Sequence, residues 1–126
     1  MAREVVFTDV RRRISEFGEL ATLVTVSEAG TPHAVTVLVS VTGDRVVATV
    51  GPRTRLNLVA RPTLSLLWLP ADGGAYQLIL DGIAETVGEE EGGALTKISI
   101  AVTNGILHRL AGRDATGPTC VALAVG

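Results

Sequence analysis

Few residues of this chain have side chains that could act in catalysis or bind a metal. Asp81 and Glu85 are four residues apart in a stretch whose pattern predicts a strand, so both side chains project to the same face. Two carboxylates on one face could act as acid and base or simply hydrate that face, and we favour hydration. We expect a surface or interface role for His33 and a helix-face position for His108. Cys120 precedes an apolar run, which predicts a buried, inert thiol.

The motifs of several other site classes are missing from the sequence. There is no clustered His and Cys set with the spacing of a zinc site, so we expect no metal. There is also no nucleophile elbow, no phosphate-binding glycine loop and no basic surface interleaved with aromatic residues. The net charge of −2 argues against non-specific nucleic-acid binding.

The composition predicts one β-rich domain spanning residues 1–126. Hydrophobic residues make up 47% of the 126 residues, but only 3% are aromatic, so the core must be built from Val, Leu, Ile and Ala. The mean hydropathy of +0.41 is high for a short chain, which favours burial of apolar surface against another subunit. The longest uncharged stretch, residues 29–43, is too short and too polar to span a membrane. The single cysteine and the lack of a signal-peptide pattern lead us to expect a cytoplasmic protein.

Hydrophobic periodicity divides the chain into strands, hairpin turns and short helices. We predict strands over residues 20–26, 31–41, 45–50, 63–69, 76–87 and 119–125, with a bulge or bend at Gly82. A first helix is expected to begin at Thr8 or Asp9 and to end at Gly18, with an apolar stripe of Val10, Ile14 and Phe17. A second helix is expected over residues 53–59. Apolar residues at helical spacing between 89 and 113 predict two further helical pieces.

The order of these local signals resembles one known family. The signals are Gly30-Thr-Pro-His33 entering the second strand, Ala48-Thr49 ending the third, residues 61–68 as the fourth, and Tyr76-Gln77 followed by Gly82-Ile-Ala-Glu85. Together they cover a little over half of the chain and resemble the pyridoxamine 5'-phosphate oxidase-like flavoproteins. The resemblance implies a mainly β fold, a split β-barrel with short helices, that forms a homodimer and binds FMN at the dimer interface.

The resemblance also implies which residues would hold the flavin. Backbone groups of the second strand would contact the ring, a Thr and an Arg would hold the phosphate, and a Gln on the fifth strand would bond the pyrimidine edge. The corresponding residues are Thr36, Val37, Leu38, Thr49, Arg53 and Gln77. A guanidinium suits a phosphate dianion because it can donate two charge-assisted hydrogen bonds. Arg53 could equally be a solvated loop residue, and Gln77 an ordinary polar residue on a half-buried strand.

The phosphate-binding run departs from the family pattern. Pro52 stands where the family has Ser, and Thr54 stands where it has Lys, while Arg55 could restore one positive charge. These differences predict a weaker phosphate site. The chain also lacks the Arg- and Trp-bearing C-terminal segment of the true oxidases, so pyridoxamine 5'-phosphate oxidation itself is not expected.

The function implied by the resemblance is a flavin-dependent oxidoreductase with an unknown small-molecule substrate. Two alternatives stay open at this stage. The cofactor could be a deazaflavin in place of FMN, or the protein could be a non-catalytic member of the same fold that binds flavin or haem.

Overall fold

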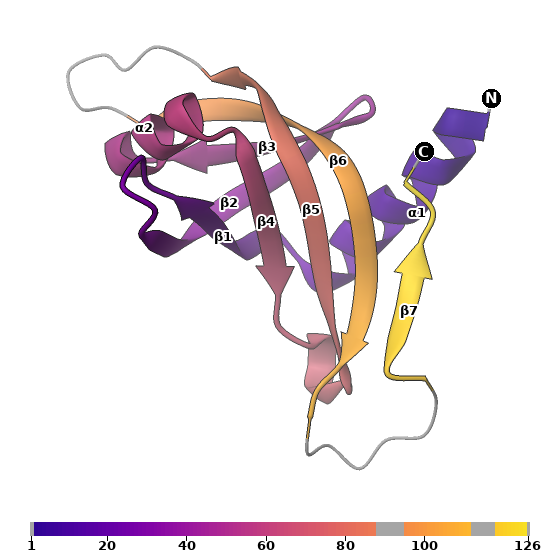
Figure 1. The fold of residues 1–126 in the computed structure, drawn as a ribbon. Helices are drawn as coiled ribbons and strands as arrows, with labels where there is room; N and C mark the ends of the chain where they lie inside the picture. Colours follow the sequence, from indigo (N-terminus) through magenta and orange to yellow (C-terminus); the bar gives the residue numbers. More distant parts are fainter. Residues whose placement is uncertain (1, 88–94, 112–117, 126) are drawn as a thin grey trace.

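The computed structural model describes residues 2–87, 95–111 and 118–125, apart from the side chains of residues 2–8, 72 and 86 (Figure 1). Its elements follow in the order α1 (Ala2–Phe17), β1 (Leu20–Val26), β2 (Pro32–Thr42), β3 (Arg45–Val50), α2 (Pro52–Ala60), β4 (Thr63–Trp68), the 3-10 turn η1 (Ala71–Gly73), β5 (Tyr76–Val87), β6 (Thr96–Arg109) and β7 (Cys120–Leu123). No helix within the described residues combines the length and the apolar character that a membrane span needs.

The strands form one antiparallel sheet that closes on itself. The strand order is β3-β2-β1-β4-β5-β6-β7, and β3 also pairs with β6, so six strands make a closed barrel and β7 extends the sheet from β6. Closure pairs the strand edges that an open sheet would expose. The mainly β barrel that the sequence predicts is therefore confirmed.

Alternation along each strand separates a core face from an outer face. In β1, Ala21, Leu23 and Thr25 are buried, whereas the residues between them are partly or fully exposed. The core is built almost entirely from aliphatic side chains, with one large aromatic residue, Trp68, which is 1% exposed. Its indole Nε1 donates a hydrogen bond to the carbonyl oxygen of Gly18 at 2.9 Å. This bond ties the end of α1 to the barrel.

Helix α1 is longer than the sequence predicts. It begins at Ala2, so the predicted start at Thr8 or Asp9 is wrong, and Asp9 instead pairs with Arg12 at 2.9 Å within the helix. The apolar stripe is confirmed at Val10, which is fully buried. Gly18 has a φ of 105°, a conformation that favours glycine and ends the helix.

Residues 96–109 form strand β6, so the two helical pieces predicted between 89 and 113 are wrong in the described part of that segment. His108 accordingly lies on a strand and not on a helix face. The alternation is interrupted because Asp81 pairs with Asn104 while Gly82 pairs with Val102, which leaves Thr103 as an extra residue. The same register shift confirms the bulge predicted at Gly82. Residues 88–94 and 112–117, which include the rest of the prediction, lie outside the described residues.

Strand β7 is shorter than the predicted strand over residues 119–125. In the described part of the chain it pairs only with β6, so it lies at the margin of the sheet, and Leu123 is its one buried residue. The Cys120 thiol is exposed, and the predicted buried thiol is wrong. An apolar neighbourhood in the sequence does not bury a residue when its strand lies outside the barrel.

Candidate functional site

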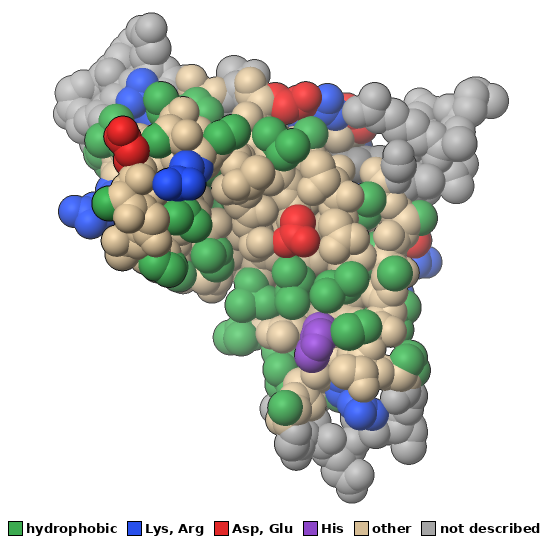
Figure 2. All heavy atoms as spheres, in the orientation of Figure 1, with side chains coloured by type: hydrophobic (Ala, Val, Ile, Leu, Met, Phe, Trp, Pro, Cys, Tyr) green, Lys and Arg blue, Asp and Glu red, His purple; other side chains and the backbone are tan. Residues whose placement is uncertain are grey.

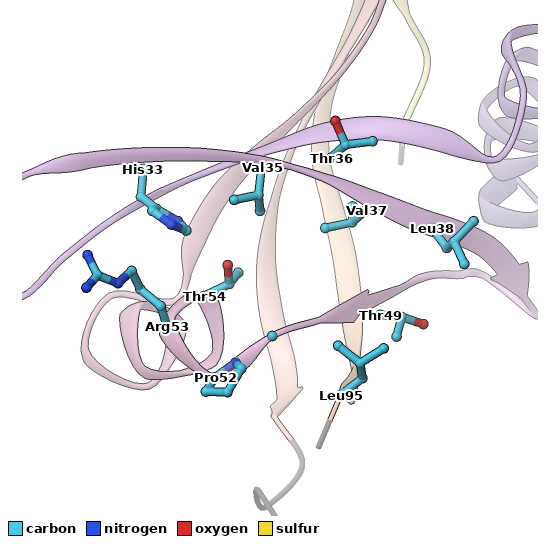
Figure 3. Close-up of a pocket in the computed structure, with 11 residues that line it drawn as sticks. His33, Val35, Thr36, Val37, Leu38, Thr49, Pro52, Arg53, Thr54 and Leu95 are labelled. Atoms are coloured by element: carbon cyan, nitrogen blue, oxygen red, sulfur yellow. The ribbon is translucent and has the colours of Figure 1, made fainter. Parts of the chain in front are cut away.

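A cavity forms where the pairing of β2 is incomplete. Residues Pro32 to Leu38 of β2 pair with β1, but the ladder with β3 runs only from Leu38 to Thr42. Among the described residues, the first half of β2 therefore has a strand partner on one side only, and the chain turns at Gly51 into α2 beside it. A cavity of about 400 Å³ lies there (Figure 3). It is lined by His33, Val35, Thr36, Val37, Leu38, Thr49, Gly51, Pro52, Arg53, Thr54 and Leu95.

The first turn of α2 presents backbone donors at this cavity. Gly51 is the N-cap and no side chain caps the helix, whose first turn carries no acidic residue. Pro52 begins the helix, and proline suits that position because its fixed φ is helical and its missing N–H would have had no helical partner. The first bond back to the cap joins the Arg55 N–H to the Gly51 carbonyl at 3.0 Å. Free N–H groups and the helix dipole make such a terminus suited to an anion.

At one end of the cavity, Arg53 contributes a guanidinium and His33 an imidazole ring. The Arg53 guanidinium is exposed, and no hydrogen bond or ion pair within the described residues holds it. His33 is half-buried, and its ring atom Nδ1 is buried without a hydrogen-bond partner among the same residues. Figure 3 shows the His33 side chain extending from β2 and the Arg53 side chain rising from α2 at the same end of the cavity. An unsatisfied buried polar atom is costly, so a ligand or water that bonds it is favoured.

The other end of the cavity is mostly apolar. Val35 and Val37 point from β2 toward the cavity, and Leu38, Thr49 and Leu95 lie together at the far end from Arg53 (Figure 3). The cavity thus has an apolar end and a cationic end with helix donors. That polarity suits an elongated ligand with an apolar ring system and a terminal anion.

No family model matches the chain. Two uncharacterised proteins, from Mycobacterium bovis and Mycobacterium tuberculosis, are each 35% identical over 68 residues, which is 54% of this chain and 48% of theirs. The chain therefore spans about half the length of these relatives.

Solved structures resemble the whole fold at low sequence identity. A Clostridium acetobutylicum protein described as related to general stress protein 26, of the pyridoxinephosphate oxidase family, has a TM-score of 0.68 at 13% identity, covering 97% of this chain and 96% of that one. This chain has the pyridoxamine 5'-phosphate oxidase-like split-barrel fold. A haem-binding protein from Mycobacterium smegmatis (TM-score 0.67, 17% identity, 99% and 58% covered) is also similar. So is an F420 reductase (TM-score 0.60, 16% identity, 73% and 94% covered).

Six of the eight residues predicted for the cofactor site line the cavity of this split barrel. They are Thr36, Val37, Leu38, Thr49, Arg53 and Thr54. The Thr36 side chain points to the opposite side of β2, so at this residue the backbone is the part that can face a ligand (Figure 3). Thr49 pairs with Leu38 and lies at the apolar end, away from Arg53, with which the sequence prediction grouped it.

Arg55 and Gln77 do not line the cavity. Arg55 is half-buried and directly follows Thr54, the last residue of α2 that lines the cavity. Gln77 is half-buried on β5 and is paired with His108 of β6. Within one chain, Gln77 and Arg53 therefore belong to different surfaces. The role predicted for each stays a prediction.

Sequence reasoning missed the helix terminus and His33 as parts of this site. The signal for the first was present, because Gly51-Pro52 before a short helical run is typical of an N-terminus. His33 alternates with Val35 and Val37, so it shares their face of β2. It is half-buried at the cavity, and the surface or interface role expected for it stays a prediction.

The two carboxylates on β5 have separate partners. Asp81 accepts a hydrogen bond from Ser65 Oγ at 2.6 Å and one from Asn104 Nδ2 at 3.4 Å. Glu85 accepts from Arg45, and the pKa of that guanidinium is raised, chiefly by this bond. Each carboxylate is thus held by its own neighbours, which agrees with a structural and solvated role. In the described part of the chain, no three His, Cys, Asp or Glu side chains gather where they could hold a metal ion.

Proposed function

We propose that this split barrel binds a flavin through its phosphate, with FMN as the simplest such cofactor, and uses it as an oxidoreductase. The observation that carries the proposal is the cavity between β2 and the uncapped N-terminus of α2, with Arg53 at its cationic end. Its volume of about 400 Å³ is in the range of small-molecule sites. Five of the six residues that the family resemblance implies for FMN line it, and so does Thr54.

The donor set fits a phosphate group. The backbone N–H groups at the start of α2 and the Arg53 guanidinium can donate to phosphate oxygens, and no acidic residue in the first turn opposes them. His33 Nδ1 has no hydrogen-bond partner among the described residues and could bond the same group. The helix terminus supplies donors that the family obtains from Ser and Lys, which offsets the differences at Pro52 and Thr54.

The remaining cavity suits the ring. Aliphatic side chains at Val35, Val37 and Leu38 can pack on an apolar ring system, and the backbone of β2 that lacks a second strand partner can bond its polar edge. A bound flavin would supply the hydride- and electron-transfer chemistry. The residues of the chain would bind the ring, orient it and exclude water from one side.

We further propose that the protein is a homodimer. The outer face of the barrel carries exposed apolar residues, including Leu20 (59% exposed), Leu38 (51%) and Ile83 (40%). Figure 2 shows hydrophobic and uncharged side chains over much of the face formed by β4, β5 and β6. Leu38 also lines the cavity, so a second copy packed there would cover the ring end. Gln77 lies on this outer side and would reach the flavin of a second copy.

Proteins of the same fold suggest two alternatives to an FMN-dependent oxidoreductase, and both are tested together with FMN. An F420 reductase is among the similar structures, which favours a deazaflavin as the second candidate cofactor. A haem-binding protein is also among them, and a non-catalytic haem- or flavin-binding role is the third. A reducing compartment such as the cytoplasm is part of the proposal, because the only cysteine of the chain has an exposed thiol.

The experiment is a titration of the purified protein with FMN, deazaflavin and haem, followed by flavin fluorescence and by absorbance. We expect a dissociation constant of order micromolar for a flavin or deazaflavin, with fluorescence quenching and a shifted flavin spectrum. Binding of haem alone, with a Soret band, would contradict the flavin proposal and favour the haem-binding role. Binding of none of the three would contradict all three cofactor roles.

A further inference from the structure

One side of α2 carries polar residues at successive helical turns. Arg53 and Asn57 are four residues apart, so they lie on the same side of the helix, and Arg61 follows after the same interval as the C-cap. Of these three residues, only Arg53 lines the cavity at the proposed phosphate position. Asn57 is buried and Arg61 is exposed. The hydrogen bonds of these two residues show what they do for the helix that carries Arg53.

Asn57 joins α2 to the barrel. Its Nδ2 donates a hydrogen bond to Thr25 Oγ1 at 3.1 Å, and both side chains are buried, so this bond between α2 and β1 is shielded from water. Thr25 pairs with His33 of β2, so the side chains of Thr25 and His33 project to the same side of the sheet. The bond therefore ties the helix to the strand position beside His33, at the cationic end of the cavity.

Arg61 ties α2 to the turn that follows β1. Its Nε donates to the carbonyl oxygen of Ser27 at 3.0 Å, and its Nη2 donates to that of Glu28 at 3.1 Å. Hydrogen bonds depend on direction, whereas the aliphatic packing of the core does not. The two ties therefore limit how far α2 can rotate about its axis or slide along β1, and the tie made by Asn57 is the buried one.

We propose that Asn57 is a positioning residue for the phosphate, an inference that rests on the proposed phosphate site at the start of α2. Arg53 lies one turn before Asn57, and the free N–H groups of the first turn belong to the same helix. Rotation of α2 would move the guanidinium and these N–H groups away from the cavity. The apolar end would keep its place, because Val35 and Val37 lie on β2. Loss of the bond to Thr25 should therefore weaken binding of the phosphate and spare binding of the ring.

The buried bond can be removed without leaving either partner unpaired. Thr25→Val combined with Asn57→Leu replaces both partners with apolar side chains of similar size, a change that can be nearly neutral for stability. Thr25→Val alone is the second variant, and it decides the test if the double variant does not fold. Thr25→Ser keeps the hydroxyl and is the conservative control. Trp68→Phe removes a hydrogen bond of similar length, 2.9 Å, between α1 and the barrel, and it controls for a general loss of stability.

The dissociation constants of FMN and riboflavin are measured by fluorescence quenching for the wild type and each variant, together with the thermal unfolding midpoint. We expect Thr25→Val and the double variant to bind FMN at least about fivefold more weakly than the wild type, with riboflavin within about twofold. Thr25→Ser and Trp68→Phe should keep the wild-type ratio of the two constants, even where the midpoint falls.

Two results would overturn the inference and leave the proposed function standing. One is a wild-type ratio in the variants that lack the bond, and the other is an equal loss of FMN and riboflavin. Failure of the wild-type chain to bind either ligand would refute the proposal of a flavin cofactor and, with it, the inference.

Discussion

The Arg53→Ala substitution tests the assignment of the phosphate to the start of α2. Charge-assisted hydrogen bonds contribute about 1.5–3 kcal/mol when well shielded, and exposed ion pairs only about 0.2–1 kcal/mol. The Arg53 side chain is exposed but lies at the cavity, where a bound ligand would shield part of it. We therefore expect a loss of about 1–2 kcal/mol, which is a roughly 5- to 30-fold rise in the dissociation constant of FMN. Some affinity for the phosphate should remain, because the helix donors remain.

Fluorescence quenching with FMN and riboflavin measures the effect directly, because riboflavin lacks the phosphate. Arg53→Ala should weaken FMN but leave riboflavin unchanged, and the difference should shrink as salt is added. Arg12→Ala is the matched control, since it removes the same charge from α1, where Arg12 pairs with Asp9. Equal loss of both ligands, or no loss of either, would refute the assignment.

Three further predictions concern the barrel and its outer face. Gly82→Ala should destabilise the fold by about 1–3 kcal/mol in thermal unfolding, because a Cβ there would lie 2.6 Å from the Ile100 side chain and 2.8 Å from the Ala101 carbonyl oxygen; an unchanged midpoint would contradict this. Trp68→Phe should cost about 1–3 kcal/mol in denaturant unfolding through the lost indole hydrogen bond and lost volume, and a neutral result would count against the tie to α1. Ile83→Lys should give a folded monomer in sedimentation analysis, because the lysine would place a charge in the proposed dimer face; a dimer of unchanged stability would contradict that face.

Most of the barrel was predictable because its strands show regular alternation. Residues 20–26, 45–50 and 76–87 have the predicted bounds of β1, β3 and β5, and each is bordered by a turn or loop. These signals are local, so the sequence alone carries them.

Strand β6 was not predictable by the same means, because its alternation changes phase. Ile98 and Ile100 are buried before the bulge at Thr103, and Gly105 and Leu107 are buried after it, so the buried positions pass from even to odd numbers. The combined spacing imitates a helix. The abundance of β-branched residues in this segment was the better indicator.

Part of the cavity's lining could be named from the sequence, but the cavity's shape could not be predicted. The sequence prediction named six of the lining residues, yet the cavity forms because, among the described residues, β3 pairs with β2 only from Leu38 onward. The position of His33 and Arg53 at one end of this cavity likewise depends on how α2 lies beside β2. No local sequence pattern indicates how strands and helices that are distant in the sequence lie against one another.

The most direct test of the proposed function is a crystal structure of the protein grown with FMN. The account predicts the phosphate at the N–H groups of α2's first turn and the Arg53 guanidinium, the ring along the first half of β2, and Gln77 of a second copy at the ring's edge. A flavin bound elsewhere on the barrel, with the cavity between β2 and α2 filled only by water, would contradict it.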